Sequence, residues 1–524
     1  MNKSMNISWW VQRWGELHPE KAAIVCGEEL ITYRDLHRRA ERTGSWLQSL
    51  GIRKGDRVAA MLQNGPEFME IYLACSRLGA IFVPVNFRLA PPELAYTLEN
   101  AKPRLFVFGE AFREAVESLR LDQARSHMLR AVLKKKPAGR ADPNERLLDY
   151  ALAARAFDGK SPSLKGSQGP ADPEEPHVIM YTSGTTGQPK GAVLSHRKTF
   201  FNCLNAEIFF KLNFDDVMLV VLPLFHSGGL FIQASPMLYK GGTIILPPKF
   251  DPPATFRDIE RRRVTKFLGV PTVYRALLGV DPADRGTLSS LRVCAIGGEK
   301  TTPGLLRTCS DAGFPLRQIM GQTETSILLW ASEKDALRKP GTLGRPVFHA
   351  EVAIVDDSGS RVAPGEVGEI VVRGSIMMTA YWQDPARTRE TIVDGWLHTG
   401  DLAKMDEDGF FYMVDRARDM YISGGENVYP AEVERVLRAH PKIEEVAVVG
   451  ASDALWGEMG VAYVIPRNGE PFLQNELESF CEGRLARFKW PRRLIFCEDF
   501  PRTSLGKVRK AELAARYGQP EKTG

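Results

Sequence analysis

The chain has 524 residues, which is too long for a single core and predicts two to four domains. Its net charge of +5 is too small an excess to argue for a nucleic-acid-binding protein. Seven cysteines without paired spacing fit a reducing cytosol rather than a disulfide framework, so we expect a cytoplasmic protein. The sequence has no cluster of zinc ligands, which argues against a structural zinc site. It has no run of about 18 apolar residues, so we expect no transmembrane segment.

The first third of the chain alternates between predicted helices and strands. Residues 1–14 hold three tryptophans but no apolar run long enough for a signal peptide, so we expect a first helix packed on the domain, with contact to a membrane surface as the alternative. Strands over 57–62 and 81–85 flank a helix over 66–78. This βαβ rhythm predicts an α/β fold with a mainly parallel sheet covered by helices.

A polar loop rich in glycine lies between two apolar runs, Val178–Met180 and Ala192–Leu194, which we predict to be buried strands. Glycines allow successive backbone N–H groups to point into one concavity that attracts phosphate, while hydroxyls and a lysine add donors and positive charge. The alternative is a flexible linker, although linkers rarely lie between apolar runs. The residues expected to hold phosphate are Thr182, Ser183, Gly184, Thr185, Thr186, Gly187 and Lys190.

The stretch Tyr181–Gly191 resembles the signature phosphate loop of the adenylate-forming superfamily, which contains acyl-CoA synthetases, peptide-synthetase adenylation domains and beetle luciferases. Further blocks follow in the family order as far as residue 507, so the resemblance covers nearly the whole chain. It implies a large N-terminal AMP-binding domain (1–415) of helix-covered β-sheets with a small β-barrel-like subdomain. A hinge (416–418) and a mobile α+β C-terminal lid domain (419–524) complete the expected architecture.

The next candidates follow strands predicted at 217–222, 266–270 and 293–296. His226 lies in a turn between Phe and Ser, and from the residues alone it is a core residue, a base or a gate. The resemblance implies that it lines the acyl pocket. Gly298-Glu299 closes the last of these strands with little side-chain bulk, so its backbone could lie against a flat ring. In the family this stretch forms one wall of the adenine site.

A second polar block is made of Met320, Gly321, Gln322, Thr323 and Glu324. A carboxylate beside a hydroxyl suits Mg²⁺, which prefers oxygen ligands shared with phosphates, whereas a surface helix start would explain the same dipeptide without function. The resemblance implies that the glutamate binds magnesium and the threonine contacts the α-phosphate. The family usually has an aromatic residue that stacks on adenine where this chain has methionine, whose sulfur can still press on a ring.

Strands predicted at 351–355, 368–372 and 409–412 are expected to form the smaller subdomain. Between them, Tyr381-Trp382 matches a family block, although the usual preceding glycine is Ala380. Asp401 follows Thr-Gly, which by itself indicates a turn former. The resemblance implies that this carboxylate accepts both ribose hydroxyls of ATP.

The segment 415–419 is either an ordinary charged loop or, by resemblance, the hinge, with Arg416 on the ribose and Arg418 at the pivot. Gly424 and Gly425 follow. Their backbone could line a tunnel for the pantetheine arm of coenzyme A, and a tight hairpin is the alternative.

The last segment predicts a compact α/β lid, with a helix starting at Pro430, strands at 446–449 and 461–465, and a helix over 472–482. The basic run 484–493 indicates a solvated face, with a site for the nucleotide phosphates of coenzyme A as the alternative. Lys507, unremarkable in a charged tail, matches the catalytic lysine of the family. Its charge would bridge the substrate carboxylate and the α-phosphate.

Together these blocks predict an ATP-dependent carboxylate–CoA ligase that uses ATP, Mg²⁺ and coenzyme A and passes through an acyl-adenylate. The expected acid is a medium- or long-chain fatty, alicyclic or aromatic acid, because Phe225, Phe231 and Val270 indicate an apolar pocket. Two alternatives are a stand-alone adenylation enzyme that loads a carrier protein and an inactive nucleotide-binding relative. The oligomeric state stays open, with a homodimer as one option.

Overall fold

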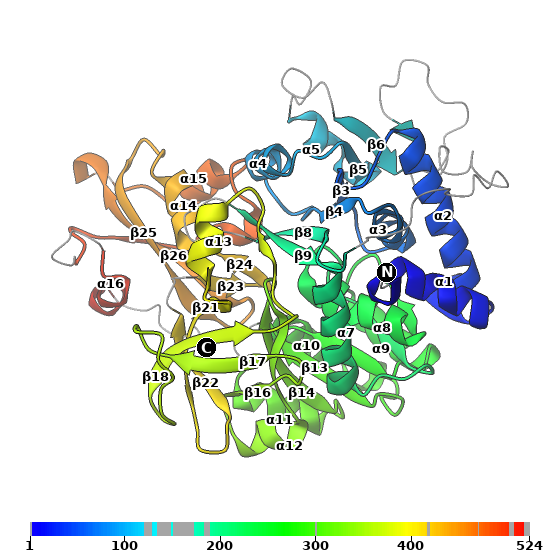
Figure 1. The fold of residues 1–524 in the computed structure, drawn as a ribbon. Helices are drawn as coiled ribbons and strands as arrows, with labels where there is room; N and C mark the ends of the chain where they lie inside the picture. The colour runs from blue at the N-terminus through cyan, green and yellow to red at the C-terminus, as the bar shows by residue number, and fades with distance from the viewer. Residues whose placement is uncertain are drawn as a thin grey trace. The chain divides into compact units, whose positions relative to one another are not determined.

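The computed structural model describes residues 3–119, 128–133, 148–149, 172–182, 189–298, 301–416, 420–469, 471–501 and 508–517. The chain packs into two compact units (Figure 1). The first contains Met1–Phe87, Leu98–Tyr181 and Gly191–Asp415, and the second contains Arg88–Thr97, Thr182–Lys190 and Arg416–Gly524. The chain passes from one unit to the other for the last time between Asp415 and Arg416, next to the segment expected to be the hinge.

One sheet follows the order β19-β9-β8-β4-β3-β5-β6-β7. Its strands are β3 (Arg57–Met61), β4 (Ile81–Pro84), β5 (Leu105–Gly109), β6 (Leu129–Leu133), β7 (Leu148–Asp149), β8 (Pro176–Thr182), β9 (Lys190–Ser195) and β19 (Ala380–Tyr381). β3, β4, β5 and β8 are parallel neighbours, and β19 joins β9 in the antiparallel sense. α3 (Pro66–Leu78) connects β3 to β4, and its buried apolar side chains lie in the core of the unit. The predicted βαβ arrangement is confirmed.

A second sheet follows the order β17-β18-β21-β22-β16-β15-β14-β13-β12-β10-β11-β1-β2, with β20 paired to β21. Its parallel half contains β1 (Ala22–Cys26), β10 (Val217–Leu219), β11 (Thr243–Ile245), β12 (Lys266–Gly269), β13 (Val293–Gly297) and β14 (Leu316–Gln322). Its other strands are β2 (Glu29–Thr32), β15 (Ser326–Ala331), β16 (Thr342–Pro346), β17 (Glu351–Val355), β18 (Val367–Arg373), β20 (Ile392–Val393), β21 (Trp396–Met405) and β22 (Phe411–Arg416).

Two expectations change in detail here. The strand predicted over 217–222 ends at Leu219, because the chain then turns towards Pro223 and the segment that holds His226. The antiparallel strands expected in a barrel-like subdomain are present, but β17, β18, β21, β22 and β16 continue the large sheet as an open path. The fold is therefore α/β, with helix-covered sheets and an antiparallel extension.

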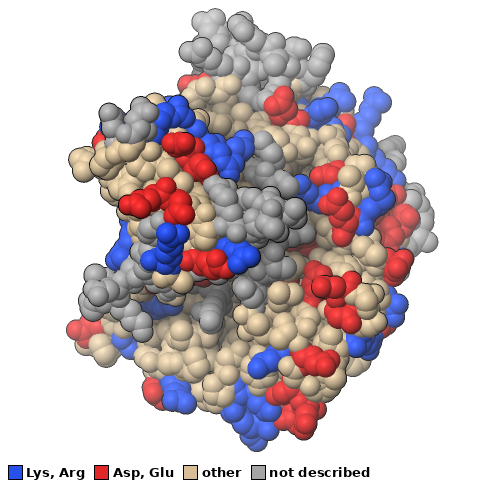
Figure 2. Space-filling view, turned by 90° about the vertical axis from the view of Figure 1, so that its left-hand side faces the viewer, with Lys and Arg blue, Asp and Glu red and all other residues tan. Residues whose placement is uncertain are grey.

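Helices of the first unit surround these sheets (Figure 1). They are α1 (Ile7–Leu17), α2 (Tyr33–Ser49), α3, α5 (Arg113–Glu117), α7 (His196–Phe210), α8 (Ser235–Lys240), α9 (Pro252–Arg261), α10 (Pro271–Leu278), α11 (Pro303–Asp311), α12 (Glu333–Arg338) and α13 (Pro385–Thr391), while α4 (Pro91–Ala101) begins in the second unit. The expected first helix packs on the domain, because Trp10 is buried in the core. Among the described residues no helix is both long and apolar enough to cross a bilayer. Figure 2 shows acidic and basic side chains interspersed over the face in view.

The second unit is an α+β fold around its own apolar cluster. Its elements are β23 (Tyr421–Ser423), β24 (Glu426–Val428), α14 (Pro430–Leu437), β25 (Ile443–Asp453), β26 (Gly457–Pro466), α15 (Gln474–Cys481), β27 (Arg493–Phe496) and α16 (Lys510–Tyr517). β25 and β26 pair in the antiparallel sense, and α15 then connects β26 to its parallel neighbour β27. The predicted helix at Pro430 begins at that residue.

Candidate active site

The turn between β14 and β15 carries the predicted magnesium ligand, Glu324. The turn is tight: a β-carbon at Gly321 would lie 1.6 Å from the carbonyl oxygen of Ser326, so only glycine fits there. Ser326 ends the turn with a φ of +59°, a backbone conformation that residues other than glycine rarely adopt. The turn buries Glu324, which keeps 6% of its surface exposed.

Two groups of one neighbouring segment hold Glu324. The hydroxyl of Tyr381 donates a hydrogen bond of 2.8 Å to Glu324 Oε1, and both side chains are buried. The backbone N–H of Met378 donates to the Glu324 carbonyl oxygen at 2.7 Å. The same segment therefore fixes both the carboxylate and the backbone of Glu324. The sequence comparison with the family singled out Tyr381 as part of a block, but gave it no role.

A buried lysine also contacts this turn. Lys198, in the first turn of α7, is fully buried and its Nζ donates to Ser326 Oγ at 2.5 Å. Burial lowers the pKa of Lys198 to about 7, and the charge of Glu324 opposes that shift. Ser326 Oγ also lies 3.4 Å from Ser227 Oγ, which follows the predicted pocket residue His226. Sequence reasoning missed Lys198, because a lysine in a short polar run carries no signal of burial.

Asp401, the predicted ribose ligand, is also held in place. Gln322 Nε2 donates to Asp401 Oδ2 at 2.7 Å and to the Thr399 carbonyl oxygen at 2.9 Å. The preceding residues of β21 are fixed by Glu369, which accepts hydrogen bonds from the Gly400 N–H and the His398 ring, both at 2.7 Å. Gln322 therefore links the end of β14 to β21, two elements that the sequence places about 80 residues apart.

Several other predicted residues lie at strand ends in the first unit. Gly298 directly follows β13 with a φ of +85°, and Met320 is half-buried near the end of β14. Thr323, beside Glu324, is half-buried, as is the side chain of His226, whose ring lies 4.5 Å from that of Phe225. The carboxyl ends of parallel strands are where ligands bind in open α/β sheets. The structure thus brings Gln322, Thr323, Glu324 and Asp401 into one region.

Only part of the phosphate loop, and not the lysine near the C-terminus, lies within the described residues. Ser183, Gly184, Thr185, Thr186, Gly187, Glu299, Arg418 and Lys507 lie outside the described residues, as does the side chain of Arg416. Of the described loop residues, Thr182 ends β8 and Lys190 begins β9. The hydroxyl of Thr182 is buried and has no hydrogen-bond partner among the described residues. A buried hydroxyl in this position is a donor suited to a phosphate oxygen.

Gly424 and Gly425 form the turn of a hairpin between β23 and β24. Both have positive φ values, +59° and +84°, and Ser423 pairs with Glu426 across the turn. A β-carbon at Gly424 would meet the Trp456 ring at 2.9 Å. The hairpin alternative is therefore what the structure contains, and the expected role in a thiol tunnel stays a prediction.

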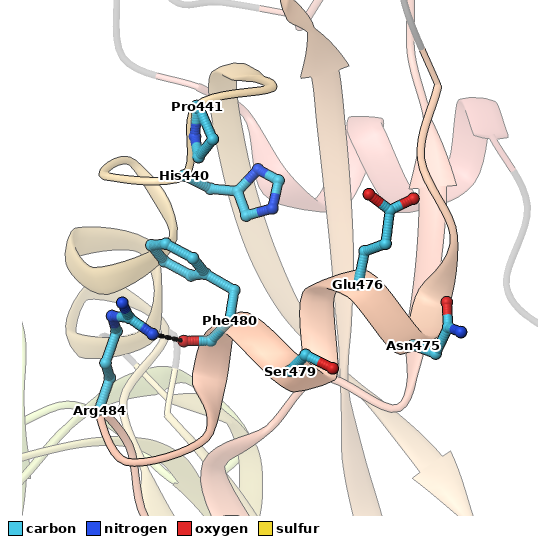
Figure 3. Close-up of a pocket in the computed structure, with 7 residues that line it drawn as sticks. All are labelled: His440, Pro441, Asn475, Glu476, Ser479, Phe480 and Arg484. Atoms are coloured by element: carbon cyan, nitrogen blue, oxygen red, sulfur yellow. Dashed lines mark hydrogen bonds between the residues drawn. The ribbon is translucent and has the colours of Figure 1, made fainter.

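The basic run 484–493 is not a uniformly solvated face. Lys489 is buried and pairs with Glu432 at 2.7 Å and with Glu93, a residue of the Arg88–Thr97 segment of the same unit. The solvated-face interpretation is therefore wrong for Lys489. Arg484 is exposed; it donates to the Phe480 carbonyl oxygen at 2.7 Å and borders a shallow pocket (Figure 3). The other lining residues are His440, Pro441, Asn475, Glu476, Ser479 and Phe480.

The residues around Glu324 fit a magnesium ion that arrives with nucleotide phosphates. Within the described part of the chain, no group of three or more His, Cys, Asp or Glu could form an all-protein metal site. Mg²⁺ is commonly bound by one or two carboxylates together with substrate phosphates and water. A single buried carboxylate with a fixed orientation matches that mode of binding.

Comparison with known proteins gives a consistent result. Residues 11–382 match the family model of the AMP-binding enzyme, and residues 432–507 match that of the AMP-binding enzyme C-terminal domain. The chain is 38% identical over 517 residues to a feruloyl-CoA synthase from Amycolatopsis sp, with 98% of this chain and 100% of the relative covered. It is 39% identical over 532 residues to an indoleacetate–CoA ligase from Aromatoleum aromaticum, with 99% and 100% covered.

Among solved structures, an o-succinylbenzoate-CoA synthetase from Bacillus subtilis, bound with its product analogue OSB-NCoA, resembles this chain with a TM-score of 0.83. The identity is 30%, and the match covers 97% of this chain and 99% of that one. Sequence and structure therefore match over almost the full length of both chains.

Proposed function

This chain belongs to the AMP-binding enzyme family and is an acyl-CoA synthetase, and from that premise we propose that it activates an aromatic carboxylic acid with ATP and transfers the acyl group to coenzyme A. The products are the acyl-CoA thioester, AMP and pyrophosphate. The observation that carries the proposal is the pair of fixed carboxylates: Glu324 is held by Tyr381, and Asp401 is held by Gln322. One carboxylate suits a metal–phosphate complex and the other suits a ribose.

The chemistry requires a better leaving group than a carboxylate offers. In the first half-reaction a carboxylate oxygen of the acid attacks the α-phosphorus of ATP, and the bond to the bridging oxygen of pyrophosphate breaks. In the second, the sulfur of coenzyme A attacks the carbonyl carbon, its proton is released, and AMP leaves with the former carboxylate oxygen. Mg²⁺, when bound, neutralises charge on the phosphate oxygens.

Each assigned residue has one task in this scheme. Asp401, with Arg416, binds the ribose, Glu324 binds the metal, and Thr323 contacts the α-phosphate. Thr182, Lys190 and the loop between them hold the terminal phosphates through backbone and side-chain donors. Lys507 stabilises the negative charge that develops during adenylation. Rotation of the C-terminal lid about Arg418 would then admit the thiol past Gly424 and Gly425.

The proposed class of acid is aromatic. The relatives named feruloyl-CoA synthase and indoleacetate–CoA ligase both act, by their names, on acids that carry an aromatic ring. The predicted pocket segment contains buried aromatic side chains: Phe225 packs edge-on to Phe87 at 5.0 Å, and Phe231 is fully buried. Aromatic surfaces favour a flat ring.

A panel of acids tests the proposed function. Purified protein, ATP and Mg²⁺ are incubated with hydroxycinnamic, indoleacetic, benzoic and medium-chain fatty acids, and acid-dependent ATP–pyrophosphate exchange is measured. Aromatic acids should support the fastest exchange, and free coenzyme A should convert the bound acyl group to a thioester. Exchange without thioester would indicate a carrier protein as acceptor instead. The absence of exchange with every acid would contradict ligase activity.

A variant of Lys507 distinguishes the two half-reactions. We expect Lys507→Ala to lower acid-dependent pyrophosphate exchange by 10²-fold or more, because a preorganised charge is removed from the transition state. Thioester formation from a synthetic acyl-adenylate should be retained. Equal loss of both half-reactions would assign Lys507 to a general structural role.

A further inference from the structure

We propose that Tyr381 is a positioning residue for the metal site: its hydroxyl orients the Glu324 carboxylate, and so links metal binding to the strand that follows the phosphate loop. The inference rests on the proposed function only in that it takes Glu324 to be the metal ligand. It concerns a side chain for which the resemblance to the family gave no role.

The first observation is the geometry of the pair. The Tyr381 hydroxyl donates to Glu324 Oε1 at 2.8 Å, and both side chains are buried, with 3% and 6% of their surfaces exposed. A hydrogen bond to a carboxylate at a buried position is stronger and more directional than one in solvent. It restricts rotation of the carboxylate, whose second oxygen then has a defined direction.

The second observation is that Tyr381 is itself rigidly placed. Its backbone N–H donates to Thr388 Oγ1 at 2.9 Å, and this residue lies in α13. On either side, the N–H of Thr379 donates to the Val193 carbonyl oxygen at 2.9 Å and that of Trp382 donates to the Gly191 carbonyl oxygen at 2.7 Å. A side chain whose backbone is anchored at three points can hold its partner within a narrow range of positions.

The third observation is where these anchors lie. β19 pairs with β9, with Tyr381 opposite Ala192 and Ala380 opposite Val193. β9 begins at Lys190, the last of the residues expected to hold phosphate. A displacement of β9 would therefore be transmitted to Glu324 through one short strand and one hydroxyl. Ala380, which replaces the glycine usual in the family, is accommodated because it is only half-buried at this position.

The neighbouring backbone supports the same conclusion. Met378, three residues before Tyr381, donates its N–H to the Glu324 carbonyl oxygen at 2.7 Å. The segment 378–382 thus contacts Glu324 through both backbone and side chain. Removing the hydroxyl alone leaves the backbone contact in place, so a variant that lacks it should keep the fold of the turn and lose only the orientation of the carboxylate.

The test measures metal binding directly. Mn²⁺ replaces Mg²⁺, and its dissociation constant for the full-length protein with a non-hydrolysable ATP analogue is measured by electron paramagnetic resonance, without acid or coenzyme A. Tyr381→Phe should weaken Mn²⁺ binding about tenfold, since one hydrogen bond to a charged group is lost. Tyr412→Phe is the matched control: it removes a tyrosine hydroxyl that donates to another carboxylate of the same unit, Asp406, at 3.1 Å. It should leave the Mn²⁺ affinity unchanged.

A double-mutant cycle shows whether Tyr381 acts through Glu324. In the Glu324→Ala background, adding Tyr381→Phe should change the Mn²⁺ affinity less than twofold, because the acceptor is already absent. Thermal unfolding of each variant monitors the fold. The inference is overturned if Tyr381→Phe binds Mn²⁺ like the wild type, if Tyr412→Phe loses as much, or if the two changes in the cycle are additive.

These outcomes are independent of the proposed ligase activity. A Mn²⁺ affinity that depends on Tyr381 in a protein without acid-dependent pyrophosphate exchange would leave the inference standing and reject the function. Normal pyrophosphate exchange with a Mn²⁺ affinity that does not depend on Tyr381 would leave the ligase function standing and reject the inference. No Mn²⁺–nucleotide binding by the wild type would reject both.

Discussion

Three described lysines are almost fully buried, Lys198 and Lys266 in the first unit and Lys489 in the second, and the surroundings of Lys198 and Lys489 differ. Lys489 in the second unit lies between two carboxylates, Glu432 and Glu93. Burial alone would lower the pKa of Lys489, but the charges of these carboxylates raise that pKa above its usual value. Lys198 in the first unit has the neutral hydroxyl of Ser326 as its acceptor at 2.5 Å, and burial lowers its pKa to about 7.

This difference helps to distinguish a structural buried charge from a functional one. A buried ion whose charge is matched by hydrogen-bonded partners is part of the architecture, and removing one member leaves the others unpaired. A buried ion held by a neutral group, as Lys198 is, lowers stability where it is charged. Such groups cluster at functional sites. The position of Lys198, one hydrogen bond from the turn that carries Glu324, agrees with that expectation.

The largest predicted effect is on the second unit. Lys489→Met should lower its free energy of unfolding by about 3–5 kcal/mol, because two buried carboxylates lose their cation. Urea unfolding combined with amide hydrogen exchange over 443–466 measures this. The control is Lys442→Met, which breaks a more exposed pair with Glu476 and should cost less than about 1 kcal/mol. Similar losses in both variants would remove the distinction between the two kinds of ion pair.

An intermediate effect is expected at the acceptor of Lys198. Ser326→Ala keeps the β-carbon, so the backbone at φ +59° is unchanged, but the buried ammonium loses its hydroxyl partner. We expect the free energy of unfolding of the first unit to fall by about 1–3 kcal/mol. Denaturant unfolding at pH 7 measures it. An unchanged stability would mean that Lys198 does not depend on this hydrogen bond.

The smallest effect is expected for Lys198 itself at high pH, where the folded protein holds its side chain neutral. Lys198→Met fills a similar volume without a charge, so the free energy of unfolding near pH 10 should change by no more than about 1 kcal/mol. Folding lowers the pKa of Lys198, so between about pH 7 and the usual lysine pKa this side chain is protonated in the unfolded wild type but not in the folded one. The wild type therefore loses stability as pH falls through that window.

The variant should therefore gain stability relative to the wild type as pH falls from 10 to 7, by at most about 1.4 kcal/mol per pH unit, and no further below pH 7. Measurements are made without metal or nucleotide. A difference that is the same at every pH would contradict the lowered pKa of Lys198. A pronounced loss of stability in the variant at pH 9 would show that the lysine, like Lys489, is structural.

Much of the architecture could be predicted because it depends on local patterns. The helix over Pro66–Leu78 was predicted at its observed bounds, and β3, β4 and β8 were predicted from apolar runs. The strand at 217 is shorter than expected, because the apolar run continues into a turn. A pattern of apolar residues cannot show where hydrogen bonding stops.

The site could be predicted only in part. Motif blocks identified Glu324 and Asp401, but not the side chains that fix them. Tyr381 lies 57 residues from Glu324, and Lys198 lies 128 residues from Ser326, so their contacts exist only in the folded chain. Lys489 was misassigned for a related reason: in a run of basic residues, the sequence does not show which one faces the carboxylates Glu93 and Glu432.

The most direct test of ligase chemistry follows an oxygen atom. An aromatic acid accepted by the enzyme is labelled with ¹⁸O in its carboxylate and converted with ATP, Mg²⁺ and coenzyme A, and the products are analysed by mass spectrometry. Attack on the α-phosphorus predicts one ¹⁸O in the phosphate of AMP and none in pyrophosphate. Label in pyrophosphate or inorganic phosphate, or unlabelled AMP beside the thioester, would contradict an acyl-adenylate and with it the roles proposed for Glu324 and Asp401.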